Sequence, residues 1–106
     1  MIEDISLKEL SDLMKSGLSK RTAIIDVRTP EEYAKEHIKG AINIPYQLMS
    51  FRYDELEPFD TLILYCAAGA RAEIACNEIE PWGTKKLFCV RSDPSQWHRY
   101  LPLEKL

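Results

Sequence analysis

The sequence predicts an α/β domain with a mostly parallel central sheet that helices cover on both faces. Three apolar runs without alternation, at residues 21–27, 61–65 and 86–90, are typical of strands buried on both faces. Segments with caps and helical spacing separate these runs. A length of 106 residues and a hydrophobic fraction of 45% suit one domain, residues 1–106, around a single modest core.

Capping patterns predict the first two helices. Ser6 and Glu9 have the spacing of a capping box, and apolar residues follow at helical spacing until Gly17, where the helix is expected to stop. Thr29 precedes a proline and, at capping-box spacing, a glutamate, which predicts a short helix through about Lys35.

A carboxylate, Asp26, interrupts the first of the apolar runs, and a buried carboxylate needs a partner. The favoured interpretation is that Asp26 accepts hydrogen bonds that fix the end of the strand. The alternative is that it indirectly orders a cysteine loop further along the chain. Arg28 is expected to form an ion pair with Glu31 or Glu32 rather than to contact a substrate.

The next segment holds a histidine and a short strand. His37 could act as a general base for a cysteine nucleophile, but a histidine that satisfies a loop hydrogen bond is the favoured interpretation. Gly40 marks a turn, and residues 41–44 are predicted to form a short strand that Pro45 ends.

Residues 46–59 are predicted to pack into the core. Leu48, Phe51 and Leu56 could line one or two helical turns, as apolar residues at such spacing usually do. Alternatively, the aromatic and methionine side chains of this segment form one wall of an active-site mouth. In that case Arg52 is a candidate for binding an anionic ligand.

The chain ends with a strand and a helix. A turn at residues 82–83 leads into 86–90, which is predicted to be the last strand. Asp93 is followed by proline and, at capping-box spacing, an amide, so a final helix is expected to carry Trp97 and Tyr100 against the core.

The most informative feature is the turn that follows the strand at 61–65. This strand ends at Cys66, and apolar residues then recur at helical spacing until Pro81. A strand that turns sharply into a helix leaves backbone N–H groups pointing inward at the positive end of the helix dipole, which makes a cradle for an anion. The same field favours the thiolate of Cys66, and Arg71 adds positive charge nearby.

The loop between Cys66 and Arg71 leaves its backbone open to a ligand, because its side chains are all tiny: Ala67, Ala68, Gly69 and Ala70. The predicted site is therefore Cys66 as nucleophile and residues 67–71 as the substrate-binding loop. Chemistry of this kind needs no metal and no organic cofactor.

The other two cysteines, Cys76 and Cys89, are interpreted as core residues, since free cysteine is often buried. A resolving role, in which one of them forms a disulfide with Cys66, is the alternative. Three cysteines without a Cys-x2-Cys pair favour neither a disulfide framework nor a structural zinc site, and free thiols fit a reducing compartment.

Charge and hydropathy exclude several classes of partner. The net charge of −3 comes from mixed charges with no basic stripe, so neither nucleic acid nor a membrane surface is an expected partner. No apolar run approaches the ~20 residues of a membrane-spanning helix, and the start of the chain lacks a signal-peptide pattern. A cytoplasmic location is therefore expected.

Three segments, in order along the chain, resemble the signatures of rhodanese-like sulfurtransferase domains. They read Ile-Ile-Asp-Val-Arg-Thr-Pro-Glu-Glu-Tyr (24–33), His-Ile-Lys-Gly-Ala-Ile-Asn-Ile-Pro (37–45) and Cys-Ala-Ala-Gly-Ala-Arg (66–71). The resemblance implies a rhodanese-like fold and a sulfurtransferase that forms a persulfide on Cys66. The sulfur donor would be a small molecule such as thiosulfate, and the acceptor a thiol, cyanide or a protein of a sulfur relay.

Two departures from the family pattern leave alternatives open. Residues 91–96, Arg-Ser-Asp-Pro-Ser-Gln, replace a Gly-Gly pair, and Ala67 replaces a common arginine. A rhodanese-like binding or regulatory module with little turnover is therefore an alternative. A cysteine-dependent phosphatase is a weaker one, because a Cys-x5-Arg loop cradles phosphate and this loop is one residue shorter. Arg71 either binds the donor or holds the loop through a carboxylate.

Overall fold

The computed structural model describes residues 2–83 and 85–106, and within them a five-stranded parallel sheet forms the centre of the molecule. The strand order is β1-β6-β5-β2-β4, and every neighbouring pair is parallel. The bounds are β1 (Ile2–Ser6), β2 (Thr22–Asp26), β4 (Ile42–Asn43), β5 (Thr61–Tyr65) and β6 (Lys86–Arg91). A small antiparallel pair, β3 (His37–Ile38) and β7 (Leu103–Glu104), lies apart from this sheet.

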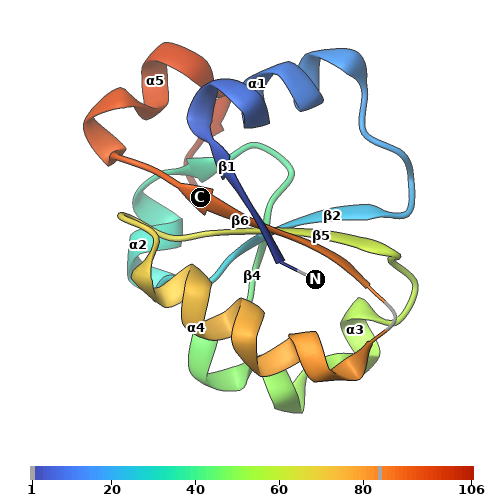
Figure 1. The fold of residues 1–106 in the computed structure, drawn as a ribbon. Helices are drawn as coiled ribbons and strands as arrows, with labels where there is room; N and C mark the ends of the chain where they lie inside the picture. The colour runs from blue at the N-terminus through green and yellow to red at the C-terminus, as the bar shows by residue number, and fades with distance from the viewer. Residues whose placement is uncertain (1, 84) are drawn as a thin grey trace.

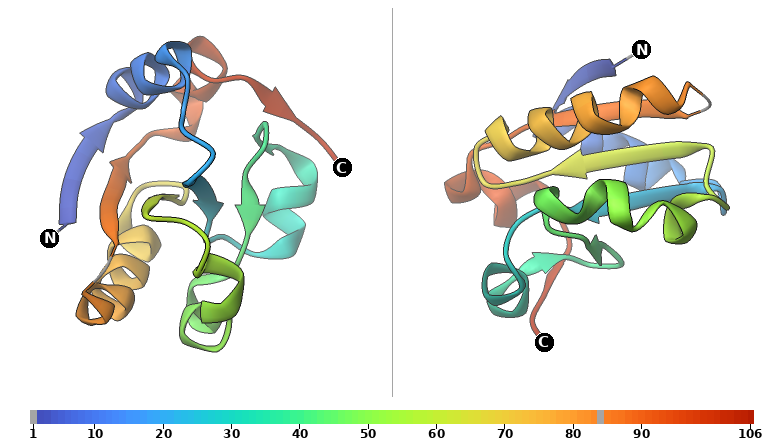
Figure 2. Two further views of the ribbon diagram at one scale, coloured as in Figure 1. Left: turned by 90° about the vertical axis from the view of Figure 1, so that its right-hand side faces the viewer. Right: turned by 90° about the horizontal axis from the view of Figure 1, so that it is seen from below.

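Helices cover both faces of the sheet, as Figures 1 and 2 show, and this confirms the predicted fold class. One face carries α1 (Leu7–Ser16) and α5 (Trp97–Tyr100), and the other carries α3 (Tyr53–Leu56) and α4 (Ala70–Ile79). The short α2 (Pro30–Lys35) lies to one side of the sheet in Figure 1. The described residues also form three 3-10 segments: η1 (Tyr46–Phe51), η2 (Glu80–Trp82) and η3 (Pro94–Gln96).

The strand β5 lies in the middle of the sheet and contributes to both layers of the core. Leu62 and Leu64 belong to the layer beneath α4, whereas Ile63 and Tyr65 belong to the layer beneath α1 and α5. Because successive side chains of a strand point to opposite faces, a strand covered twice is apolar throughout. This explains the run without alternation that predicts the strand.

The capping boxes predicted at Ser6 and Thr29 form as expected. The hydroxyl of Ser6 accepts a hydrogen bond from the Glu9 N–H at 3.1 Å, and the Glu9 carboxylate accepts one from the Ser6 N–H at 2.9 Å. Thr29 and Glu32 make the same reciprocal pair at the start of α2. At the C-terminal end of the chain, Asp93 caps η3 by accepting from the backbone N–H of a serine, and α5 follows directly.

Three strands, β1, β3 and β7, were not predicted. Strand β1 lies at the edge of the sheet beside β6 and has a mixed burial pattern in which Glu3 and Asp4 are exposed, so it lacks a continuous apolar run. The predicted strand at 86–90 is confirmed as β6, but it is not the last strand, because β7 follows it. A pair only two residues long has no periodicity from which it could be predicted.

Residues 46–59 form helical turns, and their side chains divide between core and surface. Met49 and Leu56 are fully buried, but Leu48 is 41% and Phe51 is 82% exposed, so the predicted core role of these two is wrong. The reason is that η1 has three residues per turn. Residues three apart then share one face, which buries Met49, packs the half-buried Tyr46 against the core and leaves Leu48 and Phe51 outside.

The buried thiols behave as predicted for core residues. Cys76 on α4 and Cys89 on β6 have no exposed surface and belong to the same core layer. Trp97 is buried and Tyr100 packs against the core beside it, as expected for the final helix.

Candidate functional site

Cys66 directly follows the central strand β5 and lies beneath the loop that leads into α4. It is 1% exposed, and its Sγ accepts hydrogen bonds from the backbone N–H of Gly69 at 3.0 Å and of Ala72 at 3.4 Å. Two N–H donors at the start of a helix thus converge on the sulfur, where they favour negative charge. Ala72 lies outside the predicted loop, although its position in the first turn of α4 marks its N–H as one without an intrahelical partner.

The turn that points these N–H groups at the sulfur requires a positive φ at residue 69, and Gly69 can adopt it. Its φ of +120° lies in the region that favours glycine. A Cβ built at this position would lie 3.2 Å from Nη1 and 3.4 Å from Cδ of Arg91. The backbone conformation therefore selects glycine at the N-cap of α4, and a Cβ there would in addition displace the Arg91 side chain.

Arg71 is held by a carboxylate. Its Nη1 and Nη2 donate to the two oxygens of Glu32 at 2.7 and 3.0 Å, in the bidentate geometry that suits a guanidinium. This is the carboxylate contact of the two roles predicted for Arg71, and the donor-binding role stays a prediction. Glu32 also closes the capping box of α2, so this pair joins α2 to the start of α4.

The hydrogen bond from Arg71 lowers the pKa of Glu32 to about 2, against an ordinary value of 4.5. A carboxyl group whose pKa is lower in the folded state than in the unfolded state stabilises the protein at any pH above its ordinary pKa. This stabilisation is lost as the pH falls from about 4.5 toward 2. Between about pH 5 and pH 2.5, the wild type should lose more unfolding free energy than Glu32→Gln, by less than ~1 kcal/mol because the pair is partly exposed.

Denaturant unfolding at the two pH values measures this difference, and glutamine preserves the capping box. Glu31→Gln, one position earlier on α2, is the matched control and should follow the wild type. If Glu32→Gln loses as much stability as the wild type, the pair does not exist in solution.

A buried network lies at the ends of β2 and β5. Arg28 donates to both Asp26 oxygens, with the shortest contact at 2.7 Å, and the Tyr65 hydroxyl donates to Asp26 at 2.8 Å. The same hydroxyl accepts from the Ile38 N–H at 3.0 Å, and burial together with Asp26 raises the pKa of Tyr65. The favoured interpretation of Asp26 is confirmed.

The predicted partner of Arg28 is wrong. Arg28 pairs with Asp26 rather than with Glu31 or Glu32, because its side chain turns back into the protein. There its guanidinium lies 4.7 Å from the ring centre of Trp97 and donates to the Glu36 carbonyl at 2.6 Å.

The segment that departs from the family pattern contacts the loop directly. The carboxyl ends of the neighbouring strands β5 and β6 bring Ser92 beside Cys66. Ser92 Oγ lies 2.5 Å from the carbonyl oxygen of Ala67 and 3.2 Å from that of Cys66. Arg91 reaches across Gly69 and pairs with Glu73 on α4 at 2.9 Å. Ser92 is not among the predicted site residues; the signal that could have found it is the replaced Gly-Gly pair.

Two further candidate site residues, His37 and Arg52, pair with residues outside the cysteine loop. His37 is buried, with Nδ1 2.7 Å from the Tyr33 carbonyl and Nε2 3.1 Å from Glu104, so the hydrogen-bonding interpretation is confirmed. Arg52 forms an ion pair with Glu55. Among residues 2–83 and 85–106, no three His, Cys, Asp or Glu side chains are grouped so as to hold a metal ion, and no helix could cross a membrane.

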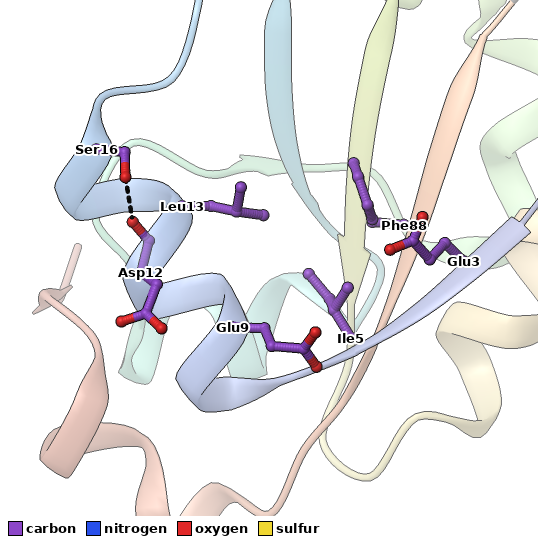
Figure 3. A pocket seen from close by; sticks show the side chains of 7 residues that line it. All are labelled: Glu3, Ile5, Glu9, Asp12, Leu13, Ser16 and Phe88. Carbon is purple, nitrogen blue, oxygen red and sulfur yellow. Dashed lines mark hydrogen bonds between the residues drawn. The ribbon is translucent and has the colours of Figure 1, made fainter.

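An open depression of about 460 Å³ lies beside the loop, and its lining includes Ala68, Arg91 and Ser92. A second pocket, shown in Figure 3, lies between α1 and the sheet, where Leu13 points toward Ile5 and Phe88. Its rim carries three carboxylates, from Glu3, Glu9 and Asp12. The lining of this second pocket includes no residue of the cysteine loop, whereas the first adjoins it.

Comparison with known proteins gives the following similarities. A family model described as "Rhodanese-like domain" matches residues 6–99. A protein of Allochromatium vinosum named "Sulfurtransferase" is 28% identical over 104 residues, which cover 97% of this chain and 95% of that protein. A Bacillus subtilis protein whose name includes "sulfur carrier protein YrkF" is 34% identical over 96 residues, 91% of this chain and 51% of the other, so the chain spans about half its length.

A solved structure agrees on the fold. The rhodanese-like domain of the Anabaena protein Alr3790 superposes with a TM-score of 0.83, covering 100% of this chain and 81% of the other at 22% identity.

Proposed function

Because the chain belongs to the rhodanese-like domain family, we propose that it is a sulfurtransferase that carries a sulfane sulfur on Cys66. The observation that carries the proposal is the pair of backbone N–H groups that converge on the Cys66 sulfur. The relatives named as a sulfurtransferase and a sulfur carrier support the same class of chemistry.

The first half-reaction loads the protein. The Cys66 thiolate attacks the outer sulfur of a donor such as thiosulfate and forms a new S–S bond. The donor's own S–S bond breaks, and sulfite leaves with the electron pair, so that Cys66 becomes a persulfide. The backbone N–H groups of Gly69 and Ala72 stabilise negative charge on the sulfur. They already point at it, so the loop does not have to rearrange during the reaction.

The second half-reaction unloads it. A nucleophilic acceptor, either cyanide or the thiolate of a small molecule or protein, attacks the outer sulfur of the persulfide. The S–S bond breaks, the Cys66 thiolate returns, and the acceptor leaves as thiocyanate or as a new persulfide. The acceptor approaches through the open depression beside Ala68, and Arg71 contributes by holding the loop against α2.

Intact-protein mass spectrometry after brief incubation with thiosulfate tests the proposal. The wild type should gain the mass of one sulfur atom, and cyanide should then remove it as thiocyanate. Cys66→Ala should gain nothing, which identifies the nucleophile.

The absence of sulfur uptake from thiosulfate and from a protein persulfide donor would contradict the proposal and favour a binding module. Cys66-dependent hydrolysis of a phosphate ester without any sulfur donor would instead assign the loop to a phosphatase.

A further inference from the structure

One hydroxyl group fastens the cysteine loop to the end of β6. Ser92 Oγ contacts the carbonyl oxygens of Ala67 and Cys66, at 2.5 and 3.2 Å, and the indole Nε1 of Trp97 lies 3.4 Å from the same Oγ. An indole N–H can only donate, and a serine hydroxyl has one proton. Trp97 therefore donates to Ser92, and Ser92 shares its one proton between the two loop carbonyls, with the shorter contact to that of Ala67.

This contact determines how the first two peptide groups of the loop are turned. The described residues contain no cis peptide bond, and in a trans peptide the C=O and N–H point in opposite directions. Since the carbonyls of Cys66 and Ala67 face Ser92, the N–H groups of Ala67 and Ala68 face away from it. The next donor along the loop, the N–H of Gly69, already binds the Cys66 sulfur.

We propose that Ser92 is a positioning residue, whose hydroxyl fixes the first two peptide groups of the cysteine loop and thereby holds the next donor, the Gly69 N–H, on the Cys66 sulfur, where it stabilises negative charge. The inference rests on the proposed function, since that charge arises on the thiolate and on the persulfide. Donors fixed before the charge forms stabilise it more than donors that must turn toward it. Ser92, which makes these hydrogen bonds to the loop, belongs to the segment 91–96 that departs from the family pattern.

Trp97, which donates to Ser92, also contacts the buried network of Asp26, Arg28 and Tyr65. Trp97 is 3% exposed, its indole lies edge to face with Tyr65 at 5.6 Å between ring centres, and Arg28 lies over it. Asp26, bonded to both Arg28 and Tyr65, thus connects to the loop through Trp97 and Ser92. The second interpretation of Asp26, that it indirectly orders the cysteine loop, has a physical route here.

Alkylation of Cys66 by iodoacetamide, followed across pH, tests the role of Ser92 without requiring sulfur transfer. Ser92→Ala should lower the alkylation rate constant near neutral pH about fivefold, the factor that corresponds to one net hydrogen bond, and should move the midpoint of the rate profile to higher pH. Ser92→Thr keeps the hydroxyl and should restore the wild-type midpoint. Ser95→Ala is the matched control, because the Ser95 hydroxyl contacts Asp93 and Gln96 instead of the loop.

Ser92→Val is equal in size to Ser92→Thr but lacks the hydroxyl, so the difference between these two variants decides the question even if the alanine variant folds poorly. Superposable profiles for folded Thr and Val variants would overturn the inference. Absence of persulfide formation in the wild type as well as in the variants, with the alkylation difference intact, would instead overturn the proposed function and leave the role of Ser92 standing.

Discussion

Asp26→Ala is expected to lower the free energy of unfolding by about 3–5 kcal/mol, the cost of leaving a buried charge without its partner. The carboxylate has no exposed surface, and Arg28, which is 7% exposed, would retain its charge beside an empty site. The Tyr65 hydroxyl would also lose its acceptor. The loss concerns three groups at once because β2 and β5 run in register, which places Asp26 opposite Tyr65.

Urea unfolding measures this effect. Asp12→Ala is the matched control, since Asp12 pairs with Lys8 on the exposed face of α1, where an ion pair contributes less than ~1 kcal/mol. Asp26→Asn keeps the size of the side chain but removes its charge, and should also destabilise strongly. Equal stability losses for Asp26→Ala and Asp12→Ala would show that the buried Asp26–Arg28 pair contributes no more to the free energy of unfolding than an exposed pair.

Gly69→Ala is expected to reduce the rate of persulfide formation by about tenfold or more, since one misplaced hydrogen-bond donor to a charged group alone costs that much. An alanine at φ +120° is strained, and its Cβ would press on the Arg91 side chain. Relief of the strain turns the Gly69 peptide and moves its N–H away from the Cys66 sulfur. The single-turnover rate of sulfur loading from thiosulfate is the measurement.

Gly40→Ala separates the loss of function from backbone strain. Gly40 also has a positive φ, +87°, but a Cβ there would meet nothing within 4 Å. Both variants should lose about 1 kcal/mol of stability, whereas sulfur loading should fall for Gly69→Ala alone. Equal loading by the two variants would mean that the Gly69 N–H does not contribute to the reaction.

Much of the fold follows from signals that lie close together in the sequence. The capping box at Ser6 and the Thr29 cap require only contacts between residues three apart, so the helix starts are readable without the tertiary structure. Strand β5 is readable for a related reason, since burial on both faces leaves an uninterrupted apolar run. Strand β1 is not readable, because an edge strand with one buried residue resembles a loop.

In the candidate site, too, the features formed by adjacent residues could be predicted, and those formed by distant residues could not. Cys66, the tiny residues after it and the positive-φ glycine form one continuous turn, and the need for an open backbone at the start of a helix is expressed in the residue types themselves. Whether Arg71 would bind a ligand or a carboxylate, and which acid Arg28 would choose, depends on neighbours from other strands and helices.

The sequence by itself therefore determined the α/β class, the helix caps and the cysteine loop, because each depends on residues within about one helical turn or one strand. The tertiary structure alone decided that Asp26 pairs with Arg28, that Glu32 holds Arg71 and that Ser92 reaches the loop. The last two contacts join segments that meet only because parallel strands end at one edge of the sheet, and strand order and register set that meeting. Asp26 and Arg28 are two residues apart, but Tyr65 and Trp97 from other elements pack around the Arg28 guanidinium.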